Sequence, residues 1–398
     1  MVNSSVQTKA NNLRSQGFFA VYFIGFLFAF HTALPTFINS SFLNVFITER
    51  LLNLVYVLAS IFTIILFFMI PYILKRFGNY RMAVFLILSE MVALLGLIFS
   101  QKPILLVSFF IISLVSISFI YFSLDIFLEG FSKNKETGQI RGTYLTLGNL
   151  AWIFSPLIVG LILKNGDYWK IYLAALIFLI PILFILVKGL RNFDDSKYEA
   201  TSFWQTLKEI CRNKNIKNIF ITTFLLNFFY SWMTIYTPLY LHKYIGFSWS
   251  EIGIIFGIML IPFVILQFPL GRIADKILGE KEILSFGFVI MSIATAILFF
   301  IPEHSSLWLW ATILFITRIG ASSVEVMGDT YFFKKVNNLN ANIISFFRIS
   351  RPLAYVLGPL VMTLSLSLIG PDRGQLFLIL GLIMLFGLWF SLGLKDTK

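Results

Sequence analysis

Charged side chains interrupt two apolar stretches near the C-terminal end of the chain: Arg318, Glu325 and Asp329 in one, Arg348 and Arg351 in the next. An arginine guanidinium can bind an anion through a planar fork of donors, and a carboxylate in such a place can bind and release a proton. Ionisable groups inside membrane-spanning helices are costly, which makes each one a functional candidate. These residues therefore indicate solute binding and proton exchange.

Depth along a helix sorts these groups, since each residue rises 1.5 Å. Arg318 lies near the middle of its stretch, and Glu325 lies about 9 Å further inward. Arg351 and Arg348 come to a similar depth on the next helix, so we expect a salt-bridge network around Glu325. Arg318 has no acid at its own depth on its own helix, so we expect it to pair with an acid on another helix, of which Glu90 is one possibility, or with an anionic part of a solute.

The composition of the chain indicates a membrane protein. Hydrophobic residues make up 58% of the 398 residues, charged residues only 13%, and the mean hydropathy is +0.86. Soluble domains contain about 45–50% apolar and about 25% charged residues. Apolar runs of about 20 residues can cross a bilayer as helices. We predict twelve such helices, at 17–39, 51–74, 82–100, 103–128, 140–163, 170–189, 216–241, 250–270, 283–301, 306–332, 343–368 and 375–394.

The basic residues give the orientation. With the N-terminus cytoplasmic, 22 of the 31 lysines and arginines lie in inside segments and six in outside loops. This asymmetry follows the positive-inside rule and places both termini in the cytoplasm. The same distribution explains the net charge of +12 without a nucleic-acid partner. The single cysteine, Cys211, excludes a disulfide framework or a cysteine-rich metal site, and we expect no cofactor.

Two similar halves flank the longest connection. "AWIFSPLIV" at 151–159 aligns with "AYVLGPLVM" at 354–362, and "LKRFGNYR" in the first half corresponds to "ILGEKE" in the second. Similar offsets in the same order indicate a duplicated six-helix unit, a common transporter plan. We predict two six-helix bundles, at 1–189 and 216–398, and a cytoplasmic linker at 190–215 that contains a short interfacial helix.

The stretch "GRIADKILGEK" resembles the loop signature of the major facilitator superfamily between helices eight and nine. Gly271, Asp275, Lys276 and Gly279 fit the signature, although one extra residue precedes the second glycine. A weaker copy, "PYILKRFGNYR", retains Arg76 and Gly78. Both loop glycines, Gly271 and Gly279, are expected at tight turns, and Asp275 is suited to cap a helix N-terminus.

The resemblance implies an all-α integral membrane fold of twelve helices and a cytoplasmic gate. The expected gate residues are Gly271, Arg272, Asp275, Lys276, Gly279, Arg76, Gly78, Glu129, Arg141, Arg348 and Arg351. The expected solute-binding residues, on helices that line the cavity in this family, are Arg318, His31, Asn149, Trp152, Asn227, Tyr230 and Trp232. The expected proton-coupling residues are Glu325, Asp329 and Asp125. Each also has a structural interpretation: an internal ion pair, a hydrogen-bonded core histidine or an aromatic residue in helix packing.

The leading hypothesis is a monomeric secondary transporter of a bacterial plasma membrane that moves a small solute by alternating access and exchanges protons. The segment "SPLIVG" is faintly similar to a helix-five motif of family antiporters and slightly favours export (efflux). Two alternatives remain open: a multipass membrane enzyme and a transport-inactive receptor or scaffold. An enzyme would need a nucleophile–base set or metal ligands, and the sequence has no HExxH or GxSxG motif.

Overall fold

The computed structural model describes residues 2–36, 38–132, 137–162, 167–193, 195, 203–302, 304–335, 341–369 and 374–395. Within these ranges every regular element is a helix. The chain divides into two compact units. Unit 1 comprises Met1–Lys133, Leu150–Thr201 and Asn338–Ser345; unit 2 comprises Asn134–Asn149, Ser202–Asn337 and Phe346–Lys398.

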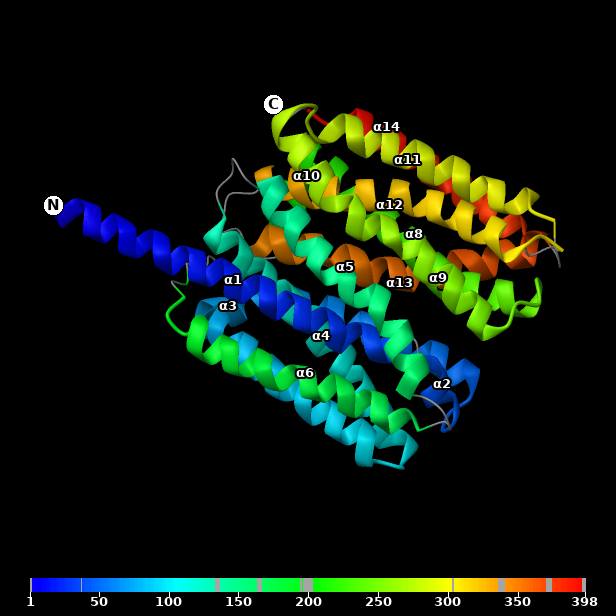
Figure 1. The fold of residues 1–398 in the computed structure, drawn as a ribbon, viewed down its shortest axis with the longest axis horizontal. Helices are drawn as coiled ribbons and strands as arrows, with labels where there is room; N and C mark the ends of the chain where they lie inside the picture. Colours follow the sequence, from blue (N-terminus) through cyan, green and yellow to red (C-terminus); the bar gives the residue numbers. More distant parts are fainter. Residues whose placement is uncertain are drawn as a thin grey trace. The chain divides into compact units, whose positions relative to one another are not determined.

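In unit 1, helix α3 packs against α4 and α6, and α1 packs against α6 and α4 (Figure 1). Helix α3 contains two predicted spans, and Gly78 separates them with φ +74°, a conformation that favours glycine. The helices of unit 1 are α1 (Val2–Thr36), α2 (Asn39–Asn44), α3 (Glu49–Phe99), α4 (Pro103–Phe131) and α6 (Tyr168–Gly189). Helix α5 (Thr137–Ile162) is divided between the units, and its residues from Leu150 onward belong to unit 1.

The turn at Gly78 is fixed by hydrogen bonds on both sides of the chain. The backbone N–H of Asn79 donates to Asp195 Oδ1 at 2.9 Å. The buried Asn79 side chain donates to the Ser123 carbonyl and accepts from the Ser123 hydroxyl, at 3.0 and 2.9 Å. A buried amide satisfied in this reciprocal way holds the start of the second half of α3 against α4.

In unit 2, α11 packs between α12 and α14, and α9 and α8 both contact α12 (Figure 1). Ser248 and Glu251 form a capping box that starts α9, and the Asn213 side chain caps α8. The helices are the first part of α5, α7 (Phe203–Arg212), α8 (Lys214–Lys243), α9 (Trp249–Ile265), α10 (Gln267–Lys276), α11 (Glu280–Ile297), α12 (Leu307–Lys335), α13 (Ala341–Ile369, of which 341–345 belong to unit 1) and α14 (Gln375–Leu392).

The second and third predicted spans both lie in α3, the eighth is divided between α9 and α10, and each of the others coincides with a single helix. The predicted all-α membrane fold is thereby confirmed. The predicted linker contains α7, as expected for its short helix. Eight helical segments among the described residues are long and apolar enough to cross a membrane. The bundle boundaries at 189 and 216 stay a prediction.

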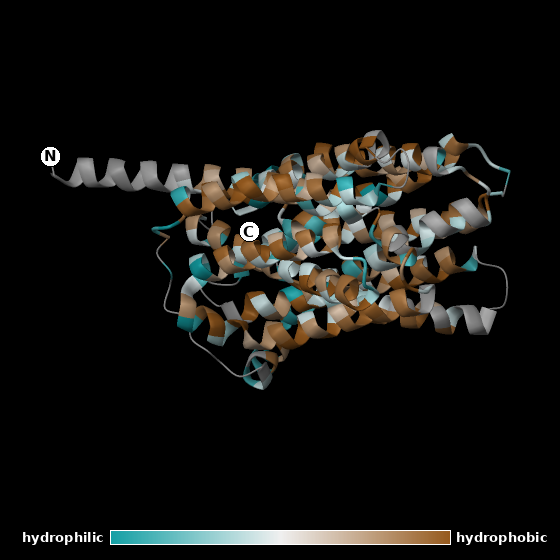
Figure 2. Cartoon of the chain, turned by 90° about the horizontal axis from the view of Figure 1, so that it is seen from below, coloured by the Kyte–Doolittle hydropathy of each residue, from teal (hydrophilic) through white to brown (hydrophobic). Residues whose placement is uncertain are grey.

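Large apolar side chains are exposed on many helices. Phe85 and Phe99 on α3 and Trp389 on α14 are 70%, 78% and 79% exposed. Figure 2 shows hydrophobic residues along most of the helices and hydrophilic residues at several connecting loops. A soluble protein rarely exposes so much apolar surface, whereas hydrocarbon is its natural solvent. The chain is therefore a multi-pass integral membrane protein.

Candidate functional site

A hydrogen-bonded chain of three polar residues connects helices α12, α10 and α5 within unit 2. Glu325 of α12 accepts a hydrogen bond at 2.6 Å from Gln267 Nε2. The Gln267 Oε1 atom accepts in turn from Asn149 Nδ2 of α5 at 2.9 Å. The sequence identified Glu325 and Asn149 as candidates for different roles, and the structure joins them through one fully buried glutamine.

The position of Gln267 follows from a helix break. Leu266 ends α9 and precedes α10, and Gln267 is the first residue of α10. A residue at such a start can aim its side chain differently from those of the preceding helix. The sequence shows Gln267 only as a polar residue in an apolar stretch, because the helix break has no strong local signal beyond Pro262, four residues before Leu266.

Arg318 is buried in unit 2, with only 4% of its surface exposed. Its guanidinium lies 5.0 Å from the centre of the Phe229 ring, and its Nη1 lies 3.4 Å from the Thr317 hydroxyl oxygen. Among the described residues, no carboxylate lies within ion-pair distance of Arg318. Glu90, named above as one possible partner, belongs to unit 1 and lies there beside His31.

Tyr230 lies in the electrostatic surroundings of both Arg318 and Arg351. The Tyr230 hydroxyl is buried and has no hydrogen-bond partner among the described residues. It lies within electrostatic range of Arg318, Arg351 and Glu325. Arg351 is exposed and lies 5.9 Å from the Tyr355 ring. Two arginines without a carboxylate partner and an unsatisfied hydroxyl are thus gathered in one unit, an arrangement suited to an anionic ligand.

The expected salt bridges around Glu325 do not form. Arg348 pairs instead with Asp329, at 3.6 Å, while Glu325 is bonded to Gln267. Both Arg348 and Arg351 act on Glu325 only over a longer electrostatic range. Asp329 lies one helical turn beyond Glu325 on α12, and it is the carboxylate within ion-pair distance of Arg348. Glu325 accepts its hydrogen bond from Gln267, which comes from a third helix.

Two further solute-binding candidates lie on α8. The Asn227 amide donates to the Thr223 carbonyl at 3.0 Å and to the Ser350 hydroxyl at 3.2 Å, so it joins α8 to α13. Trp232 is 1% exposed and packs against Phe228 and Tyr236. Trp152 of α5 is half-buried. Their solute contacts stay predictions.

Unit 2 also contains a charged cluster, which we call the loop cluster: Asp275, Glu280 and Lys334. The Lys334 ammonium lies 2.7 Å from Asp275 Oδ1 and 2.5 Å from Glu280 Oε1. The other Asp275 oxygen accepts a hydrogen bond at 2.9 Å from the backbone N–H of Gln139, in the first turn of α5. Asp275 thus caps a helix N-terminus, where the exposed N–H groups and the helix dipole favour an anion.

The two loop glycines have different functions in the fold. Gly279 has φ +87° and precedes α11, as expected for a tight turn. Gly271 was expected at a turn, and this is wrong: it lies inside α10. There it faces Gly138 of α5, where a methyl group at Gly138 would lie 2.7 Å from the Gly271 carbonyl oxygen. The absence of side chains lets the two backbones touch.

The remaining gate candidates are spread over both units. In unit 2, Arg272 and Lys276 are exposed, whereas Arg141 is 1% exposed and lies 3.3 Å from the Phe333 ring. In unit 1, Arg76 is exposed beside Phe77, at 5.3 Å from that ring. Asp125 and Glu129 are both buried in α4, also in unit 1.

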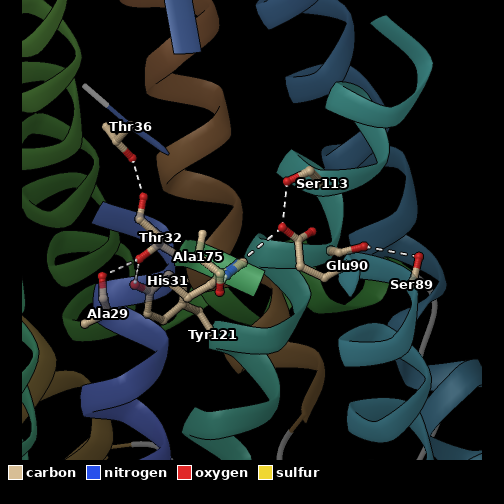
Figure 3. Close-up of polar contacts among 10 residues, drawn as sticks. Ala29, His31, Thr32, Thr36, Ser89, Glu90, Ser113, Tyr121 and Ala175 are labelled. Atoms are coloured by element: carbon tan, nitrogen blue, oxygen red, sulfur yellow. Dashed lines mark hydrogen bonds and ion pairs between the residues drawn. The ribbon is translucent and has the colours of Figure 1, made fainter. Parts of the chain in front are cut away.

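In unit 1, His31 of α1 meets Glu90 of α3 (Figure 3). The two side chains are 1% and 0% exposed, and Nε2 lies 3.2 Å from Glu90 Oε1. Ser113 of α4 donates to the same carboxylate oxygen at 2.7 Å, and His31 Nδ1 lies 3.1 Å from the Ala175 carbonyl oxygen. The sequence analysis considered His31 and Glu90 separately and did not predict their contact, because they are 59 positions apart and on different helices.

Among the described residues no cluster of metal ligands occurs.

Comparisons with known proteins agree with this architecture. The family model described as Major Facilitator Superfamily matches residues 17–359 and 238–398. The crystal structure of the human organic anion transporter MFSD10 (TETRAN) is 13% identical, with a TM-score of 0.77, and the match covers 95% of this chain and 99% of that one. The transporter FucP in the outward conformation is 14% identical, with a TM-score of 0.74 and coverage of 94% and 97%. A comparison with curated protein sequences finds no match.

Proposed function

The chain belongs to the major facilitator superfamily, and from this premise we propose that it is a secondary active transporter for a small anionic solute, coupled to protons. The observation that carries the proposal is the buried guanidinium of Arg318, which has no carboxylate partner among the described residues. A charge in the middle of a membrane costs at least about 2.5–3.5 kcal/mol. Such a cost is offset when an anionic solute binds.

The chemistry of the neighbouring groups favours an organic anion. The Arg318 guanidinium can bind a carboxylate, sulfonate or phosphate through two parallel hydrogen bonds. The Tyr230 hydroxyl, which lacks a partner, can donate to the same anion, and Arg351 adds a second positive charge. The structural neighbour MFSD10 is described as an organic anion transporter, which makes this solute class the first to test.

Glu325 is the proposed proton carrier. Its carboxylate is held by the Gln267 amide, and Gln267 is held by Asn149, so a change at Glu325 is passed to α5 by two hydrogen bonds. Proton binding at Glu325 removes its negative charge, weakens the hydrogen bond from Gln267 and reduces its attraction for Arg348 and Arg351. We propose that this links proton movement to rearrangement of α10 and α5.

The positive-inside pattern supports a topology with both termini and the loop cluster on the cytoplasmic side. There the contact of Asp275 with α5 would close the cytoplasmic entrance, and its opening would be one step of alternating access. The membrane that we propose is a bacterial plasma membrane. Export by antiport is the direction that we favour, and a monomer is the proposed functional form.

Thermal stabilisation of the purified protein tests the solute class. A pool of organic anions is compared with the corresponding neutral amides or esters. A ligand at 100 times its Kd stabilises the folded state by about 2.7 kcal/mol, which a thermal scan detects. We expect the anions to stabilise the wild type and to fail with Arg318→Ala. The matched control, Arg212→Ala, removes an exposed arginine of α7 and should respond as the wild type does. Equal stabilisation of Arg318→Ala by the same anion contradicts the assignment.

Transport in proteoliposomes tests the coupling and separates a transporter from a receptor or scaffold. With a solute from the thermal screen, wild-type protein should accumulate that solute when a pH gradient is imposed. Glu325→Gln imitates the protonated carboxyl group, so it should lose accumulation and retain exchange of labelled for unlabelled solute. Accumulation by Glu325→Gln against a gradient would remove Glu325 from the proton pathway. A wild type that binds but neither accumulates nor exchanges solute would be a receptor.

A further inference from the structure

The His31–Glu90 pair is a titratable centre that the proposed transport mechanism does not use. It lies wholly within unit 1, between α1, α3, α4 and α6, and both side chains are almost completely buried. A buried carboxylate needs compensation by a charge or by hydrogen-bond donors. Glu90 has one hydroxyl donor, Ser113, on Oε1, while its Oε2 atom has no hydrogen-bond partner. The balance at this site therefore depends on His31.

The ring nitrogens of His31 can be assigned from their neighbours. Nδ1 lies 3.1 Å from the Ala175 carbonyl oxygen, which can only accept a hydrogen bond. Nδ1 must therefore carry a proton, because a bare nitrogen would repel the carbonyl oxygen. Phe28 stacks on the ring with a centroid distance of 5.2 Å and restricts its rotation. The tautomer is thus set by the Ala175 carbonyl of α6 (Figure 3), and the orientation of the ring by Phe28 of α1.

The contact with Glu90 then requires a second proton. Nε2 lies 3.2 Å from Glu90 Oε1, which is ion-pair distance, but the contact does not have the geometry of a hydrogen bond, so Nε2 is otherwise unsatisfied. A neutral ring with its proton on Nδ1 would present a lone pair from Nε2 to a negative oxygen. That contact is repulsive, so one proton must lie either on Nε2, giving an imidazolium beside a carboxylate, or on the Glu90 carboxyl group. In either form the pair as a whole has a net charge of zero.

The surroundings do not offer another counter-charge. On α1, the Thr32 hydroxyl lies 2.9 Å from the hydroxyl of Tyr121, a titratable group on α4. On α4, Ser113 is neutral, and on α6 the contact is a backbone carbonyl. Among the described residues, His31 is the only basic side chain within ion-pair distance of Glu90. Loss of the second proton would thus leave one buried negative charge.

We propose that His31 and Glu90 form a proton-binding site of unit 1, in which the two residues share one proton that is held either on His31 Nε2 or on the Glu90 carboxyl group. The occupied site is neutral and fits the close packing of α1 on α6 and α4. The empty site is negative and requires water or a cation, so proton release favours a looser arrangement of these helices. This proposal does not depend on the solute or on Glu325.

Nitrogen NMR of histidine tests the site directly. The chain has only three histidines, His31, His242 and His304. Protein labelled with ¹⁵N-histidine, with His242→Asn and His304→Asn introduced to assign the spectrum, reports both ring nitrogens of His31 at neutral pH. We expect a protonated Nδ1 together with an Nε2 signal displaced from that of a bare nitrogen. A His31 ring with a bare Nδ1 and a protonated Nε2 would overturn the proposal.

Two variants add the direction of the effect. Glu90→Gln removes the carboxylate, so His31 should lose its Nε2 proton and become neutral while Nδ1 stays protonated. Ser113→Ala removes a donor that stabilises the charged carboxylate, so the shared proton should move towards Glu90 and the Nε2 signal towards that of a bare nitrogen. The matched control is Ser116→Ala, one turn further along α4, where the hydroxyl bonds to Ser89 and not to Glu90. Identical His31 spectra for the wild type and Ser113→Ala, or a Ser116→Ala shift as large as that of Ser113→Ala, would contradict the shared proton.

Discussion

At the scale of single residues, the charge of Arg318 is proposed to bind a ligand and at the same time lowers the stability of the ligand-free protein. Its guanidinium is buried beside the Phe229 ring, with no carboxylate within ion-pair distance among the described residues. Arg141 is buried as deeply, but it lies 3.3 Å from the Phe333 ring and makes further interactions. The two arginines therefore differ in how well the folded protein compensates their charge, and the same substitution should affect them in opposite ways.

We predict that Arg318→Met makes the ligand-free protein at least as stable as the wild type, with a gain on the order of 1 kcal/mol, because a buried charge without a partner is replaced by an apolar chain of similar length. Arg141→Met, the control, should lower stability by about 1–3 kcal/mol, because it removes contacts that the fold uses. Thermal unfolding in the same detergent measures both. A clear loss of stability in Arg318→Met would assign Arg318 to the scaffold.

At the scale of elements, the contact of α5 with α10 depends on glycine. Gly138 faces the Gly271 carbonyl oxygen, and a methyl group at Gly142 would lie 2.7 Å from the Gln267 carbonyl oxygen. Asp275 and Gln139 add one hydrogen bond to this approach. The same helix pair holds Asn149 against Gln267, so the spacing of the backbones also sets the geometry of the polar chain.

We predict that Gly138→Ala forces α5 away from α10 and costs about 1–3 kcal/mol, because backbone atoms cannot yield as a side chain can. Gly257→Ala in α9 is the control: no atom lies within 4 Å of the new methyl group, and alanine should stabilise the helix by up to about 1 kcal/mol. Thermal unfolding of the two variants gives the comparison. Equal effects would show that the close approach is not required.

The loop cluster gives a second prediction at this scale. Asp275→Asn keeps the shape of the side chain but loses the charge that holds Lys334 and the first turn of α5. We expect slower net transport and a folded protein, since Lys334 retains Glu280. Glu282→Gln, an exposed change in the first turn of α11, is the matched control and should transport normally. Wild-type transport by Asp275→Asn in proteoliposomes would remove this role.

At the scale of the whole molecule, the native cysteine reports the topology. Cys211 is exposed on α7 and is the only cysteine in the chain. If the linker is cytoplasmic, a membrane-impermeant maleimide should label the wild type only in inside-out vesicles. Lys243→Cys in a Cys211→Ser background should be labelled only in right-side-out vesicles, because Lys243 ends α8 at the opposite side. Labelling of both positions from one side would refute the predicted orientation.

Helix positions could be predicted from the sequence, because apolar runs of spanning length are a strong signal. The partners of the polar residues could not. Glu325 was expected to bond to arginines, yet Gln267 reaches it from a helix break that no local pattern announces. Glu90 was weighed as a partner for Arg318 and is bonded to His31. Depth in the membrane restricts which groups can meet, but helix rotation decides which ones do, and rotation depends on packing between distant segments.

The polar centre of unit 2 has a consequence for synthesis. Helix α12 carries Arg318, Glu325 and Asp329, and even its most apolar 18-residue window has a mean hydropathy of only 1.4, against 2.2 for the 18 residues of α14. Each such charge adds up to about 3 kcal/mol to insertion of an isolated helix. We therefore expect α14 to enter a microsomal membrane alone in a glycosylation-mapping assay and α12 to enter efficiently only when α11 precedes it. Because α12 contains the charged residues that are proposed to act in transport, we expect α11 and α12 to insert into the membrane together, as a helical hairpin.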